Sequence, residues 1–164
     1  MEARKLIGDV PWIAEDGSVD LAKFPIDRVL QQALDTSPRA FRSGLHLLGA
    51  MYSHGREEAG VFLLGLLLAC DDNWERRGLI VEALQGMNTQ ACANLLFGEL
   101  KRVRSSNTTR RYLAAVIKVL VSMPAELTEE GFAALADDKS LSQKMRAKFK
   151  AAVAPDRRFD DDWS

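Results

Sequence analysis

From Phe24 onward, apolar residues recur every three or four positions, which is the spacing of one face of an α-helix. The pattern is interrupted by short breaks that carry the Pro, Gly, Ser, Thr and Asn residues typical of helix ends. Including capping residues, the expected helices run from about Pro25 to Ala33, Pro38 to Ser53, Glu57 to Cys70, Asp72 to Gly86, Asn88 to Val103, Ser105 to Pro124, Glu126 or Thr128 to Ala136, and Ser140 to Pro155.

Residues 1–23 do not follow this helical spacing. An Asp16-Gly17 pair lies between two short apolar runs, and Asp-Gly in that position favours a tight turn. We expect an N-terminal arm, either as a small hairpin that Trp12 attaches to the helices or as an unordered segment.

Three segments of the chain resemble one another: Arg42-Ser43-Gly44-Leu45, Arg76-Arg77-Gly78-Leu79 and Arg110-Arg111-Tyr112-Leu113, whose first arginines are 34 residues apart both times. Self-similarity at such a period indicates a solenoid, in which each unit buries its apolar face against its neighbours. The short breaks require neighbouring helices to pack antiparallel. The predicted fold is therefore all-α, a right-handed superhelix of about four helical hairpins over residues 24–155.

The stretch from Asp72 to Leu84 resembles the second helix of a HEAT repeat. The loose pattern of that family is an Asp, a basic residue about four places later, and Ala and Leu some seven places further, matched here by Asp72, Arg76, Ala83 and Leu84. Residues 107–120 are a weaker copy, with Asn107 in place of the acid. The resemblance covers roughly residues 24–153. The tetratricopeptide repeat has the same period, but its Trp, Gly, Tyr and Pro positions are not matched.

The resemblance implies that second helices line a concave face and that the Asp and Arg of the pattern bond successive repeats. It therefore implies a structural role for Arg76 and Arg110. The polar positions expected to contact a partner are Arg77, Glu82, Arg111 and Lys118. The positions expected in the core are Leu45, Leu48, Leu79, Leu84, Leu113, Val116 and Leu120.

Charge is distributed unevenly, although the net charge of the chain is only −1. Residues 1–99 carry a net −5 and residues 100–155 a net +6. The bases that form a candidate anion or nucleic-acid patch are Lys101, Arg102, Arg104, Arg110, Lys144, Arg146, Lys148 and Lys150. A basic stripe along a solenoid is typical of nucleic-acid binding, and an ordinary solvated helix face is the alternative.

Residues 156–164 combine four acids with two aromatic residues, Phe159 and Trp163, after Pro155. They are a candidate docking tail for the groove of a partner. The alternatives are a clasp onto the basic helix over residues 144–150 and a frayed terminus.

Residues for metal or acid–base chemistry are scarce. His46 and His54 are eight positions apart on one expected helix, too far for one ion to bind both. Cys70 and Cys92 lie in apolar runs and are expected to be reduced core residues. We therefore expect no cofactor, no metal and no catalytic residues.

The longest uncharged apolar stretch, residues 59–70, is too short to span a bilayer and is typical of a buried helix. With no signal-peptide pattern, the chain is expected to be cytoplasmic, without a membrane partner.

The predicted function is a non-catalytic scaffold or adaptor that binds another protein on its concave face. Nucleic-acid binding through residues 101–118 and 144–150 is the alternative. An enzyme similar to a DNA glycosylase is a weaker one, because Asp71, Asp72, Trp74 and Arg76 match HEAT-like alkylpurine glycosylases in residue type alone.

Overall fold

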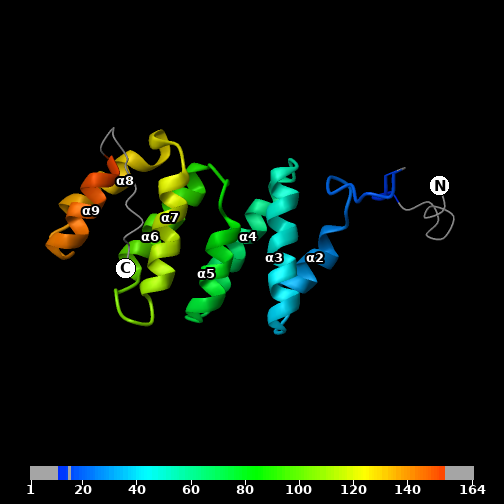
Figure 1. Cartoon of the computed structure of the whole chain (residues 1–164), viewed down its shortest axis with the longest axis horizontal. Coiled ribbons are helices and arrows are strands. Elements are labelled where there is room, and N and C mark those ends of the chain that lie inside the picture. The colour runs from blue at the N-terminus through cyan, green and yellow to red at the C-terminus, as the bar shows by residue number, and fades with distance from the viewer. Residues whose placement is uncertain (1–10, 15, 154–164) are drawn as a thin grey trace. The chain divides into compact units, whose positions relative to one another are not determined.

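The computed structural model describes residues 11–14 and 16–153, and the regular structure in those ranges is helical apart from one isolated antiparallel bridge (Figure 1). The described helices are α2 (Ile26–Ala33), α3 (Pro38–Ser53), α4 (Glu57–Ala69), α5 (Trp74–Ala83), α6 (Gln90–Arg102), α7 (Arg110–Ser122), α8 (Ala125–Asp137) and α9 (Gln143–Val153). The predicted all-α class is confirmed. The chain divides into two compact units, residues 1–70 and residues 71–164, and each is described by itself.

In the first unit, α3 packs against both α2 and α4. The close approach of α2 and α3 depends on Gly44, where a Cβ atom would lie 2.4 Å from the backbone nitrogen of Ala33. The residues that form the core of this unit are Val29, Ala33, Phe41, Leu45, Leu48, Met51, Ala59, Leu63 and Leu67.

The N-terminal arm is attached to the first unit through backbone carbonyls. Ile13 and Val19 form the antiparallel bridge, around a turn in which Gly17 has a φ of 84°. Arg56, just before α4, donates from Nη1 to the carbonyl oxygens of Ala22 and Phe24, both at 3.1 Å. The expected small hairpin thus takes the form of a single bridge, and Arg56 is a contact that the sequence analysis did not anticipate.

The apolar stretch over α4 is not buried on all sides, contrary to expectation. Its buried face consists of Ala59, Gly60, Leu63 and Leu67, while Val61, Phe62 and Leu68 are 65%, 38% and 70% exposed. Apolar content without periodicity cannot indicate which side of a helix packs. None of the described helices has the length and apolar content needed to cross a membrane.

In the second unit, α5 packs on α7, α6 packs on both α7 and α8, and α8 packs on α9 (Figure 1). The rings of Phe97, Phe132 and Phe149 link α6, α8 and α9, with centroids 5.1 Å and 6.0 Å apart in that order. At Gly131 a Cβ atom would lie 2.3 Å from the Phe97 ring, so a glycine is required where α8 approaches α6.

Helix starts mostly follow the predicted capping residues, with shifts of one or two positions. Thr89 accepts a hydrogen bond from the Cys92 backbone nitrogen at 3.2 Å, as a cap at that position should. Asn73, rather than Asp72, caps α5 through the Arg76 nitrogen at 3.1 Å. The nitrogen of Met145 donates to Ser142 Oγ at 3.3 Å, so Ser142, not Ser140, takes the capping role at α9. The largest shift is at α7, which was expected to start at about Ser105, capping residues included, but begins at Arg110.

We expect Gly44→Ala to lower the free energy of unfolding by about 1–3 kcal/mol, because the new methyl group overlaps the backbone of α2. Gly65→Ala on α4 is the matched control, since a Cβ there meets nothing within 4 Å. The control should be neutral or stabilising by up to about 1 kcal/mol through helix propensity. Urea unfolding followed by circular dichroism measures both, and equal effects would contradict the close approach of α2 and α3.

Candidate protein-binding groove between α5 and α7

A groove of about 350 Å³ lies between α5 and α7 in the second unit. Its wall on α5 and its wall at the start of α7 together contain Trp74, Glu75, Gly78, Leu79, Glu82, Thr108, Arg111, Tyr112 and Ala115. Both walls belong to helices that the HEAT resemblance predicts to be second helices. Two of the four residues expected to contact a partner, Glu82 and Arg111, line the groove.

Helical spacing explains why these residues share a surface. Gly78 and Leu79 lie three and four positions after Glu75, and Glu82 lies seven positions after it. This spacing brings the four residues to one side of α5. Gly78 keeps the middle of the groove open, because a Cβ atom at this position would meet nothing within 4 Å. Leu79 was expected in the core but is only half-buried and lines the groove instead. The other six expected core residues are buried.

Beside the groove lies a polar cluster, which we call the Glu99 cluster: the buried residues Arg77, Glu99 and Tyr112, and the exposed Arg102. Arg77 Nη2 donates to Glu99 Oε2 at 2.7 Å, and the Tyr112 hydroxyl donates to the same oxygen at 2.5 Å. Arg102 donates from Nη2 to Oε2 and from Nε to Oε1, both at 3.1 Å. The carboxylate on α6 therefore binds side chains of α5 and α7 simultaneously.

Electrostatics favour the ionised form of Glu99. Burial by itself would raise the pKa of its carboxyl group, but hydrogen bonds from Arg102, Tyr112 and Arg77 outweigh burial, so the pKa lies below its ordinary value of 4.5. Burial and the bond to Glu99 raise the pKa of the Tyr112 hydroxyl. Tyr112 therefore stays protonated and acts as a donor. The guanidinium of Arg77 also lies 5.6 Å from the centre of the Tyr112 ring, within cation–π range.

Arg77 was expected to contact a partner, and this expectation is wrong. It is only 4% exposed, and it forms an ion pair with Glu99, 22 positions later in the chain. The HEAT pattern had implied that Arg76 was structural and Arg77 free. Adjacent helical residues point about 100° apart, and Arg77 is the one that points toward Glu99 of α6 and Tyr112 of α7.

The remaining predicted residues of the groove are exposed. Glu82 and Arg111 line it, and neither side chain has a hydrogen bond or ion pair within the described part of the chain. Lys118 is exposed two helical turns beyond Arg111 and does not line the cavity itself. The aromatic end of the groove was missed: the rings of Trp74 and Tyr112 have centroids 5.3 Å apart. Their 38-residue separation gave no sequence signal for that contact.

The candidate basic patch is only partly available. Arg102 belongs to the Glu99 cluster and also lies 3.4 Å from Asp72, while Arg110 Nη2 donates to Asn107 Oδ1 at 3.4 Å. Lys101, Arg104, Lys144 and Lys150 are exposed. Arg146 and Lys148 are half-buried.

Asp138 lies within electrostatic range of bases from residues 101–118 and from residues 144–150. Hydrogen bonds from Ser140 lower the pKa of its carboxyl group, and the positive charges of Lys101 and Arg146 lower it further. Lys101 lies on α6 and Arg146 on α9, so bases of both clusters come together near the loop between α8 and α9. The candidate docking residues Phe159 and Trp163 lie outside the described residues.

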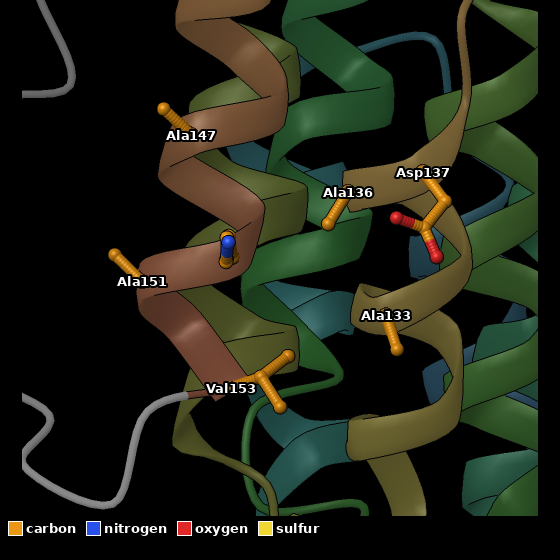
Figure 2. Close-up of a pocket in the computed structure, with 7 residues that line it drawn as sticks. Ala133, Ala136, Asp137, Ala147, Ala151 and Val153 are labelled. Atoms are coloured by element: carbon orange, nitrogen blue, oxygen red, sulfur yellow. The ribbon is translucent and has the colours of Figure 1, made fainter.

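A larger groove, of about 770 Å³, runs between α8 and α9 (Figure 2). It is lined by Ala133, Ala136 and Asp137 of α8 and by Ala147, Lys150, Ala151 and Val153 of α9. Its walls are almost entirely methyl groups and offer two charged side chains, so they provide little polar specificity. The α5–α7 groove combines aromatic rings, acids and a base, and is the better candidate for recognition.

No group of three or more His, Cys, Asp or Glu in the described ranges is arranged to hold a metal ion. Two of the acids considered for glycosylase chemistry have structural contacts. Asp71 accepts a hydrogen bond from the Asn73 backbone at 3.2 Å, and Asp72 pairs with Arg102. Trp74 lies in the groove beside Glu75 and Glu82.

Comparisons of the chain with protein-family models, with curated proteins and with solved structures found no match.

We expect Glu99→Gln to destabilise the protein by about 3 kcal/mol at neutral pH, because it leaves Arg77 buried without a counter-ion. The folded-state pKa of Glu99 is lowered, so its stabilisation is fully present above the ordinary value of 4.5 and is lost as the pH falls through the lowered pKa. The gap between wild type and variant should therefore narrow in acid. Thermal unfolding at several pH values measures this gap. Glu82→Gln, at an exposed position, is the control and should change stability little at any pH.

Proposed function

We propose that this chain is a non-catalytic protein-binding module and that the α5–α7 groove holds a segment of a partner protein. The observation that carries the proposal is an open groove whose exposed charges, Glu82 and Arg111, have no hydrogen bond or ion pair among the described residues. Trp, Tyr and Arg are enriched at binding surfaces, and the groove contains one of each: Trp74, Tyr112 and Arg111.

The Glu99 cluster supports this proposal because it fixes the walls of the groove. Binding sites are most effective when side chains beneath them hold the walls in position before the partner arrives. Tyr112 takes part in both features: its hydroxyl binds Glu99, and its ring contacts Trp74 at the end of the groove.

A HEAT-like solenoid remains our proposal for the architecture. In the second unit, α5 packs on α7 and α6 on α8, while the consecutive pairs α6–α7 and α8–α9 are also in contact. Stacked helical hairpins produce this alternation, and the 34-residue spacing of the arginines agrees with it. A right-handed superhelix of about four hairpins and a cytoplasmic location are parts of the same proposal.

Filling the groove tests the proposed function. Gly78→Leu places a side chain in the open space between α5 and α7, and it should leave stability unchanged or raise it by up to about 1 kcal/mol through helix propensity. Gly98→Leu on α6 is the matched control, since a Cβ there also meets nothing within 4 Å and this position lines a different groove. Random peptides displayed on phage are selected on the wild-type protein, and their affinities for the three proteins are measured by calorimetry.

The expected result is that Gly78→Leu abolishes binding of the selected peptides and Gly98→Leu does not. Binding that survives Gly78→Leu, or a selection that yields no peptide, would contradict the proposed function. Thermal unfolding of both variants shows that a loss of binding does not arise from a loss of folding.

Nucleic-acid binding is the second candidate, favoured by the meeting of the two basic clusters near Asp138. The exposed bases Lys101 and Lys144 come from the two clusters, whereas Arg102 is committed to Glu99 and Asp72.

If this candidate is correct, labelled oligonucleotides should bind, and the affinity should fall with salt at a log–log slope of about −4.5 for about five phosphate contacts. Replacing Lys101 and Lys144 with Glu should remove binding, while Arg39→Glu on α3 should not. Fluorescence anisotropy at two salt concentrations measures this, and an absence of binding at low salt excludes the candidate.

A further inference from the structure

We propose that the α5–α7 groove selects a partner segment by opposite charges along its two edges: basic side chains face α5 and acidic side chains face α7. This inference rests on the proposed function and adds the chemistry of the partner.

The wall on α5 is acidic. Glu75 and Glu82 are two helical turns apart on one side of the helix, and both are exposed. The two arginines of this helix do not line the cavity. Arg77 is turned inward and paired with Glu99. Glu82, whose side chain has no hydrogen bond or ion pair among the described residues, therefore presents a carboxylate to a partner along this edge.

The wall on α7 is basic. Arg111 lines the cavity, and Lys118 lies seven positions later on the same side of the helix, with Ala115 between them. The α7 sequence from Arg110 to Ser122 contains no Asp or Glu. Lys118 therefore extends the positive edge beyond the cavity, and it was one of the four residues expected to contact a partner.

Between the two edges, the groove is uncharged and partly aromatic. Gly78, Leu79 and Ala115 occupy the middle, and the rings of Trp74 and Tyr112 close one end. This arrangement has room for an apolar side chain of the partner between charged neighbours. A volume of about 350 Å³ is at the small end of the range for binding pockets, so it suits a short segment.

Charge complementarity then decides which segments bind. A segment with Lys or Arg on one edge and Asp or Glu on the other forms favourable pairs along both walls. The reversed segment brings like charges together on both walls, which is how interfaces exclude incorrect partners. In an extended peptide, neighbouring side chains point to opposite sides, so alternating basic and acidic residues satisfy this requirement.

The experiment exchanges the charges of the groove. Random peptides displayed on phage are selected on the wild-type protein and, separately, on a variant carrying both Glu82→Lys and Arg111→Glu. Both changes are at exposed positions, and unfolding curves confirm that each variant is folded. The affinities of synthetic copies of the selected peptides for wild type, single variants and double variant are measured by calorimetry. Glu57→Lys and Arg39→Glu, exposed positions in the first unit, are the charge-matched controls.

We expect peptides selected on the wild type to contain both basic and acidic residues and to lose at least about tenfold in affinity for each single variant, but not for the controls. Copies with their charges exchanged should bind the double variant and not the wild type. Peptides that Gly78→Leu excludes but the charge exchange does not affect would overturn this inference and leave the proposed function standing. A selection with no peptide dependent on Gly78 overturns both.

Two other occupants would also overturn the inference. If the groove binds a second copy of this chain, sedimentation will show self-association that Gly78→Leu abolishes. If it binds nucleic acid, a single-stranded oligonucleotide will displace the selected peptides.

Discussion

The carboxylate of Glu99 is the interaction on which the second unit depends. It lies on α6, and it accepts hydrogen bonds from Arg77 of α5, from Arg102 of its own helix and from Tyr112 of α7. A buried charge is costly unless it is paired and its hydrogen bonds are satisfied. These donors meet that condition, and because they come from three helices, they fix the helices relative to one another. Removal of one of these side chains would destabilise the unit, because a buried charged or polar group would lose its partner.

This constraint also determines the groove beside the cluster. The Glu99 cluster sets how closely α5 approaches α7 at the level of Tyr112, whose ring then faces Trp74 at 5.3 Å. The cluster therefore sets the distance between the exposed charges of α5 and those of α7, whether or not a partner is bound. A buried polar cluster of this kind contributes specificity of arrangement as well as stability. The proposed recognition of a doubly charged segment follows from this preset geometry.

Glycines have two opposite roles in the chain. Gly44 and Gly131 lie where a neighbouring helix leaves no room for a methyl group. At Gly65, Gly78 and Gly98, a Cβ would meet nothing. Gly78 contributes open space to the α5–α7 groove.

The sequence alone determined the helices, because apolar spacing and capping residues are local properties: Thr89 caps α6, and Gly55 and Gly86 follow helix ends with positive φ. It also predicted that Glu82 and Arg111 lie on polar helix faces, because the helical period separates polar from apolar positions. Both are exposed and line the α5–α7 groove. The tertiary structure decided which of two adjacent arginines is buried, which side of α4 is exposed and which aromatic rings meet. The physical reason is that each outcome depends on contacts with another helix and not on local sequence: Arg77 turns inward because Glu99 and Tyr112 are there to bind it.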